Sequence, residues 1–487
     1  MDSVIPGVLL LKKTFGMKKR RNLYQCVTNI QHILNRIIVV PYQVDLGFSK
    51  KLTNKYVTFV LDDGNETNTT PIIATLKHVF GDVDDPVAWN EYQLYYRGLQ
   101  TKMSLQKTIP ETHNPNQNII DRSSEFAFTV DNENTEDFDD AFSICRLETN
   151  CTRLSIYIAD VASRFSAAEI GDMISLKGAA HRPASIYLSH RRVPLFPAAW
   201  AREFSLNSGS PHRAVALDVF IDSTSGAIVR AEWARRVTIC VKKHYRYHDV
   251  YDDHPHLAEF MSLSRSQGTP TSLKSAVTHW MEFYCAEAGR RLWPTRSGIF
   301  MRLRGRTTHF SLVENKEEAR EAREAKYYMN DANDANDAND INNNYSDYSL
   351  KEDVEKRYVQ VTSPIRRWMD IYNQHCLSSD DEGGGRGDDI VIPLERINEQ
   401  MRQIRKLQMD SALMARFPEI SASSKTFVAT LMDVFEKNGE PKKYKYTVFL
   451  EELNLVSRLT TMEPLDEIQP SHAVRIFIFK DEHSRKK

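Results

Sequence analysis

The sequence has 487 residues, and its 64 Lys and Arg against 65 Asp and Glu give a formal charge of −1, which excludes a histone-like polycation but not a nucleic-acid enzyme. Its 41% hydrophobic and 26% charged residues are typical of a globular protein, and the length suggests about three domains. Six scattered cysteines exclude a disulfide framework. No apolar run approaches the ~18 residues of a membrane span. We therefore expect a soluble, intracellular protein of the cytoplasm or nucleus without a secretory signal.

The N-terminal part is rich in short runs of β-branched and aromatic residues, separated by turns that contain Asp, Asn and Gly. Strands of this length and spacing favour small barrels of the oligonucleotide-binding (OB) kind, although periodicity alone does not distinguish a barrel from a sandwich. Six cations within residues 12–21 are interpreted either as a solvated basic loop or as a rim that contacts phosphate groups.

The pattern is again strand-like from Glu125 to about Asp222, whereas the apolar residues from Lys274 to Leu292 recur with a helical period. We therefore expect a packed amphipathic helix there, and another helix that begins near Pro393. Two polar tracts interrupt these elements, and we interpret them as a low-complexity insertion at 330–349 and a polar linker at 378–389.

An acidic cluster lies between two of the expected strands. Its members are Asp131, Asp137, Asp139 and Asp140. Carboxylates at close range repel one another, and a divalent cation removes the conflict. Oxygen ligands of this charge suit Mg²⁺ or Mn²⁺ and not zinc. A calcium loop of the EF-hand type fails on spacing, because Glu136 and Phe142 occupy the positions of its glycine and its bidentate glutamate, so an acidic surface loop is the remaining alternative.

A second polar segment lies far downstream, at residues 358–370. Pro364 sets the direction in which a helix starts, and Arg366 and Arg367 offer guanidinium groups to phosphate oxygens. The alternative is a helix start whose arginines form surface salt bridges. Together with the aspartates, this segment favours metal-assisted attack on a phosphodiester, in which an arginine neutralises charge on the pentacoordinate phosphate.

The motifs TVDNENTEDFDDA and TSPIRR together resemble those of the ribonuclease II/ribonuclease R family, whose catalytic unit is the RNB domain, in the style of its eukaryotic exosome-type members. The likeness extends, in the family's order, to VFGDVDDPVAWNEYQLYYRGL, IADVASRF and RPASIYLSHRRVPLFP. The resemblance implies a multidomain protein in which an α/β (α+β) RNB catalytic domain is flanked by small barrels of the OB or cold-shock type. The implied parts are a truncated or degenerate first OB/cold-shock region at 1–40, a second cold-shock-like OB barrel at 41–112, the RNB domain at 113–420 and a degenerate C-terminal OB barrel at 421–487.

The resemblance further implies a 3′-to-5′ exoribonuclease that hydrolyses single-stranded RNA to nucleoside 5′-monophosphates with Mg²⁺ or Mn²⁺, alone or in a larger RNA-processing complex and without a membrane partner. The four aspartates match the family's metal site. Among them, Asp139 and Asp140 are also expected to be catalytic, together with Arg366. Tyr187 matches the tyrosine that stacks on 3′-terminal nucleotides, because an aromatic face accepts any base; a core tyrosine is its alternative.

Arg367 and Gln408 complete the candidate substrate contacts. Gln408 stands where the family usually has a glutamate, and the helical period places it inward on one face. The other members of that face are Ile397, Met401, Ile404 and Ser411. An inward amide supplies no charge, so we expect an altered rate or tighter product retention. The glutamine at position 408 and the degenerate barrels favour an alternative, in which the protein is a catalytically weakened RNB-like protein that binds RNA or acts as a scaffold.

Overall fold

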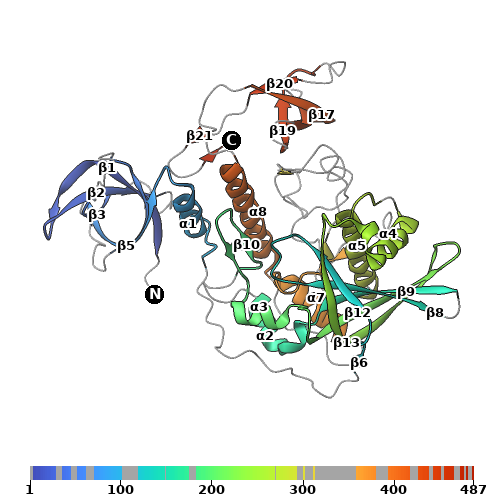
Figure 1. Ribbon diagram of the computed structural model, residues 1–487. Helices are drawn as coiled ribbons and strands as arrows, with labels where there is room; N and C mark the ends of the chain where they lie inside the picture. Colours follow the sequence, from blue (N-terminus) through green and yellow to red (C-terminus); the bar gives the residue numbers. More distant parts are fainter. Residues whose placement is uncertain are drawn as a thin grey trace.

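Figure 1 shows the computed structural model of the chain. The residues that it describes are 4–28, 36–44, 52–61, 71–100, 119–147, 150–174, 182–268, 270–292, 300–301, 311–312, 358–379, 393–416, 426–437, 443–450, 455–465, 472–475, 479–480 and 485–486. The expected insertion at 330–349 and the expected linker from 380 onward lie outside the described residues, whereas 378 and 379 end a helix.

The N-terminal strands form one closed five-stranded barrel with the order β1-β2-β3-β5-β4. Its strands are β1 (Ile5–Lys18), β2 (Arg21–Val27), β3 (Ile38–Tyr42), β4 (Lys55–Leu61) and β5 (Ile72–Asp82). The boundary that we expected between residues 40 and 41 falls inside β3, because this strand pairs with β2 on one side and with β5 on the other. The described strands between Ile5 and Asp82 therefore form a single barrel, and the basic segment 12–21 belongs to its β1–β2 hairpin.

Helix α1 (Pro86–Tyr96) follows the barrel directly. Asp85 caps it by accepting a hydrogen bond from the Val87 amide at 2.9 Å, and Pro86 occupies the first helical turn, where its missing N–H costs nothing. Trp89 of this helix is buried in the large core that extends through the central part of the chain.

The central sheet has the order β12-β9-β8-β7-β13-β6, and an additional β12–β13 pairing closes it into a barrel-like form. Its strands are β6 (Ile120–Asp121), β7 (Ala127–Asp131), β8 (Asp140–Leu147), β9 (Cys151–Ala159), β12 (Pro211–Asp222) and β13 (Ile228–Arg246). β13 is 19 residues long, so its first part pairs antiparallel with β12 and its last part parallel with β7. The acidic segment connects β7 to β8.

Helices and a small hairpin complete this part of the chain (Figure 1). They are η2 (Ala162–Arg164), α2 (Ala167–Ile174), the hairpin of β10 (Ile186–Tyr187) and β11 (Arg192–Val193), α3 (Ala198–Phe204), η3 (Tyr251–Asp253), α4 (Pro255–Gln267), α5 (Leu273–Leu292), α7 (Trp368–Ser379) and α8 (Leu394–Arg416). The two helices predicted from the apolar period are confirmed as α5 and α8. The predicted inward face of α8 is confirmed too, since Ile397, Met401, Ile404 and Ser411 are buried and Gln408 is half-buried.

The C-terminal strands form a five-stranded sheet with the order β15-β19-β18-β17-β20. Its strands are β15 (Ser311–Leu312), β17 (Thr426–Lys437), β18 (Lys443–Leu450), β19 (Leu455–Thr461) and β20 (His472–Arg475). Two further pairs are β14 (Phe300–Met301) with β16 (Tyr358–Val359), and β21 (Phe479–Lys480) with β22 (Arg485–Lys486). None of the helices in the described part of the chain combines the length and apolar character that a membrane crossing requires.

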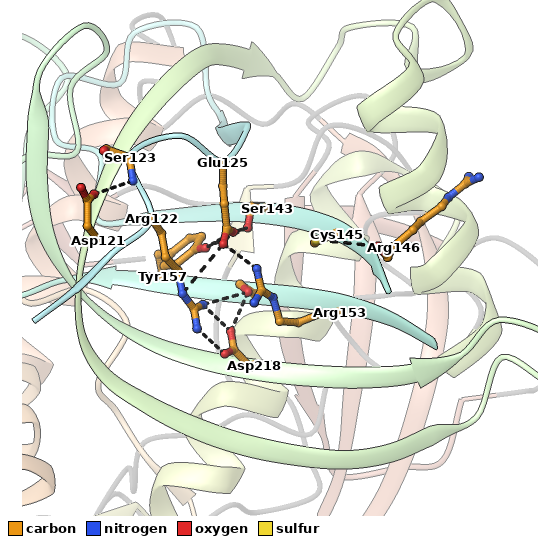
Figure 2. Close-up of polar contacts among 11 residues, drawn as sticks. Asp121, Arg122, Ser123, Glu125, Ser143, Cys145, Arg146, Arg153, Tyr157 and Asp218 are labelled. Carbon is orange, nitrogen blue, oxygen red and sulfur yellow. Dashed lines mark hydrogen bonds and ion pairs between the residues drawn. The ribbon is translucent and has the colours of Figure 1, made fainter. Parts of the chain in front are cut away.

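A buried polar network holds the chain that leads into β7 (Figure 2). Arg122 donates from both terminal nitrogens to the two oxygens of Asp218 at 2.7 and 2.6 Å, and the Ser155 hydroxyl donates to the same carboxylate at 2.6 Å. Arg153 forms a second ion pair with Glu125 at 2.6 Å. Removing one partner of such a buried pair costs roughly 3–5 kcal/mol, so the network fixes the start of the segment that ends at the acidic cluster.

Candidate active site

The four aspartates occupy one end of the central sheet, because β7 and β8 are antiparallel neighbours joined by the acidic segment. Asp131 is the last residue of β7 and Asp140 the first of β8, with Asp137 and Asp139 in the connection. Between the last two, Phe138 is buried, its ring lies 4.0 Å from that of His244, and its amide donates to Ser205 Oγ at 2.8 Å. The buried ring therefore fixes the backbone from which the neighbouring carboxylates project.

Asp139 joins the two motifs that are far apart in the sequence. Its Oδ1 accepts a hydrogen bond from the amide of Ile365 at 2.9 Å, and its Oδ2 lies 3.2 Å from Nε of Arg366. The residue is only 4% exposed. Burial raises the pKa of Asp139 to about 7, although Arg366 acts in the opposite direction. The structure thus places a buried carboxylate directly against the arginine that follows Pro364 and Ile365.

The other three carboxylates also lie in an environment that disfavours their charge. Burial raises the pKa of Asp131 to about 6, and burial together with Asp131 and Asp139 raises the pKa of Asp140 well above its usual value. Burial raises the pKa of Asp137 as well, in spite of an ion pair with Arg192. The cluster is therefore an electrostatic conflict that the described side chains compensate only in part.

The fit to a divalent cation can be judged from these contacts. Arg366 and Arg192 already face Asp139 and Asp137. Asp131 Oδ2 is buried and has no hydrogen-bond partner among the described residues, and carboxylate oxygens are the ligands that Mg²⁺ and Mn²⁺ prefer. The donor chemistry therefore fits such an ion, although within the described ranges no three His, Cys, Asp or Glu side chains are gathered closely enough to share one.

The two arginines of the downstream motif point to different partners. Arg366 donates to Ser363 Oγ at 2.7 Å and keeps 44% of its side chain exposed, so its guanidinium can face both Asp139 and a ligand. Although burial lowers its pKa, Asp139 outweighs this effect and raises the pKa of Arg366 above its usual value. Arg367 instead forms an ion pair with Asp370 at 2.9 Å, and the same carboxylate accepts from the Ser363 amide at 2.8 Å. Arg367 thus holds the turn that presents Arg366.

Tyr187 lies in β10 with 41% of the residue exposed, so it is not a core tyrosine. Burial raises the pKa of its hydroxyl, and the charges of Arg366 and Asp139 also act on this pKa, so the hydroxyl lies within electrostatic range of the acidic cluster. The Tyr187 amide donates to Gln408 Oε1 at 2.8 Å. The inward amide of α8 therefore holds the backbone of the tyrosine.

Two residues at the site carried too weak a signal to be singled out from the sequence. Arg192 lies opposite Tyr187 in the β10–β11 hairpin and forms the ion pair with Asp137. The short sequence separation of Arg192 from Tyr187 was the only feature of the sequence that could have indicated this position. Tyr247 donates its amide to the Asp131 carbonyl at 3.0 Å, and burial and the carboxylates of Asp140 and Asp131 raise its pKa. Its position follows from the parallel β7–β13 pairing, which the local sequence does not reveal.

Comparison with known proteins agrees with this architecture. The RNB domain profile matches residues 119–253. Ribonuclease R of Mycoplasmopsis pulmonis (strain UAB CTIP) is 34% identical over 113 residues, which are 23% of this chain and only 15% of that curated relative.

Two solved structures show the same fold at low sequence identity. Mycoplasma genitalium RNase R in complex with ribose methylated single-stranded RNA superposes with a TM-score of 0.62 at 16% identity, covering 93% of this chain and 81% of that one. Yeast Ssd1, a pseudonuclease, superposes with a TM-score of 0.60 at 12% identity, covering 94% of this chain and 65% of that one. Residues 119–253 thus match the RNB domain, and the fold of the chain is similar to that of ribonuclease R.

Proposed function

We propose that the protein is a 3′-to-5′ exoribonuclease that hydrolyses single-stranded RNA to nucleoside 5′-monophosphates. The observation that carries this proposal is the buried contact between Asp139 and Arg366, surrounded by three more carboxylates whose pKa values are raised. A protein that only bound RNA would gain nothing from carboxylates that repel both one another and the phosphate backbone. A nuclease needs such groups to act on a phosphodiester.

Asp131, Asp137, Asp139 and Asp140 would hold Mg²⁺ or Mn²⁺ once their carboxylates draw closer together than they lie among the described residues. When bound, such an ion supplies an activated water and neutralises charge on the phosphate. Two observations support this assignment. Asp131 Oδ2 has no hydrogen-bond partner among the described residues, and the carboxylates of Asp131 and Asp139 repel the charge of Asp140.

The protein's own side chains would hold and orient the RNA. Arg366 neutralises negative charge that develops on the scissile phosphate, because its guanidinium is partly exposed beside Asp139. Tyr187 stacks on a base near the 3′ end through its exposed ring. Gln408 holds the Tyr187 backbone, and Arg367 supports Arg366 through Asp370.

The N-terminal barrel is assigned to the OB type and to RNA binding. Its β1–β2 hairpin carries six cations in residues 12–21, and it turns at Lys19 and Arg20, whose φ angles are 50° and 64°. Most of these cationic side chains are exposed, which suits contact with phosphates and not with base edges. Binding through this hairpin should weaken steeply as salt rises.

The test is Asp139→Asn, with Asp252→Asn at an exposed position of η3 as the matched control. The first variant should lose at least about 10³-fold in the rate of mononucleotide release, since it removes a charge that acts at the reacting phosphate. Its affinity for RNA should stay within about twofold, because the barrel contacts remain. Degradation of a 3′-labelled oligonucleotide by Asp139→Asn at the wild-type rate would refute the proposal.

The second candidate is a catalytically weakened RNB-like protein that binds RNA or acts as a scaffold. Gln408, which supplies no charge where the family usually has a glutamate, favours it, and the pseudonuclease Ssd1 shares the fold. This candidate predicts that wild-type protein binds single-stranded RNA and releases no mononucleotide with either Mg²⁺ or Mn²⁺.

A further inference from the structure

Helix α1 is tied to the N-terminal barrel by close aromatic and backbone contacts. Tyr92 stacks on Tyr56 of β4 with ring centroids 4.5 Å apart, and Tyr95 lies 5.2 Å from Phe80 of β5. A Cβ atom at Gly81 would stand 2.9 Å from that of Ala88, so the strand and the helix approach as closely as a glycine permits. A displacement of the barrel must therefore also displace α1.

The same helix meets the catalytic domain through a charged contact. Glu91 accepts hydrogen bonds from Nε and Nη2 of Arg191 at 2.6 and 2.8 Å, and its Oε1 lies 2.8 Å from Nε2 of His190. Although burial raises the pKa of Glu91, these two partners outweigh it and lower the pKa below its usual value. Arg97, directly after the end of α1, donates to Gln403 Oε1 of α8 at 2.8 Å.

His190 and Arg191 belong to the loop of the β10–β11 hairpin, which carries two site residues. Tyr187 and Arg192 are register partners in this hairpin, and Arg192 pairs with Asp137. The opposite side of the loop is held by α8, where Ser411 Oγ accepts from the Ser189 amide at 2.9 Å. In Figure 1, α1, β10 and α8 accordingly lie side by side.

We propose that Glu91 is a positioning residue that links the N-terminal barrel to the catalytic site. By holding His190 and Arg191, it fixes the hairpin and with it the placement of Tyr187 and Arg192 beside the aspartates. The effect on catalysis rests on the proposed function, whereas the mechanical link does not.

The kinetic test compares Glu91→Gln with Glu259→Gln. Glu259 is a matched control because it is equally exposed (25%) and pairs with Nε of Arg146 at 2.8 Å, on a side chain that is 80% exposed. Glu91→Gln should lower kcat about tenfold, since small misplacements of positioning groups are costly, and should leave KM for RNA within about twofold. The reciprocal pair Glu91→Arg with Arg191→Glu should recover kcat to within about threefold of wild type, because it restores the ion pair.

A second measurement, amide hydrogen exchange of residues 186–193, needs no substrate. Glu91→Gln should raise exchange in this segment, and Glu259→Gln should not. If the wild-type protein releases no mononucleotide, raised exchange confined to the hairpin retains the link and refutes only the proposed function. Unchanged exchange overturns the inference, as does raised exchange with an unchanged kcat in an active enzyme. A raised KM with unchanged kcat also overturns it, because Glu91 would then act in RNA binding.

Discussion

At the residue scale, the acidic cluster behaves as a set of groups whose charge the fold opposes. Asp139 and Asp131 have pKa values of about 7 and about 6, above the ~3.9 of an unfolded aspartate. A carboxyl whose pKa is raised by folding stabilises the native state while it is protonated, and this contribution is lost as the pH rises through the folded pKa. The metal-free protein should therefore lose stability from these groups between about pH 4 and pH 7.

The loss of stability with rising pH leads to a prediction for metal binding. Mg²⁺ should raise the Tm of the wild-type protein more at pH 8 than at pH 5, because the carboxylates are ionised and uncompensated only at the higher pH. Asp131→Asn should raise the metal-free Tm at pH 8, since it removes one repelling charge, and should reduce the gain from Mg²⁺. Thermal unfolding with and without Mg²⁺ measures both effects, with Asp252→Asn as control. A gain from Mg²⁺ that is the same at both pH values, or unchanged in Asp131→Asn, would count against the assigned ion.

At the element scale, the β10–β11 hairpin is the part that the sequence described least well. The hairpin lies in the stretch predicted to be strand-like, and the resemblance singled out Tyr187, but nothing local revealed that two helices hold the hairpin loop. Helix α8 is the opposite case. Its apolar period predicted the inward position of Gln408, because helical spacing alone determines which residues share a face.

The contact between Gln408 and the Tyr187 amide leads to a prediction about two substitutions. Gln408→Ala removes an acceptor worth about 1 kcal/mol and should lower kcat about fivefold by loosening the hairpin. Gln408→Glu keeps an acceptor oxygen at the same place, so it should leave the hairpin anchored and kcat within about twofold of wild type. Single-turnover rates of mononucleotide release provide the measurement. Equal loss in both variants would show that the amide N–H₂ group, and not the acceptor, matters.

At the scale of the whole molecule, the sequence predicted what depends on local pattern and motif. Both predicted helices and the strand-rich central part are confirmed, and the predicted resemblance to the RNB-domain family is confirmed by the profile match at residues 119–253. The contact between Asp139 and Arg366, which are 227 residues apart, was suggested by chemistry and is present in the structure.

What the sequence did not predict depends on contacts between distant segments. The predicted barrel boundary at residue 40 falls inside β3. The apolar sequence of β3 does not indicate whether the strand is the first of a barrel or lies between two other strands. Arg192 and Tyr247 reach the aspartates only through hairpin register and parallel pairing with β7, which no local pattern encodes. The Glu91 contact likewise arises from the packing of α1 against the hairpin.

The most direct test of the central claim is a time course of uniformly labelled single-stranded RNA with the purified wild-type protein, in Mg²⁺ and in EDTA, with products resolved by size. We expect nucleoside 5′-monophosphates from the first time point in Mg²⁺ and intact RNA in EDTA. Internal fragments without mononucleotides, or RNA that stays intact in both Mg²⁺ and Mn²⁺, would contradict it.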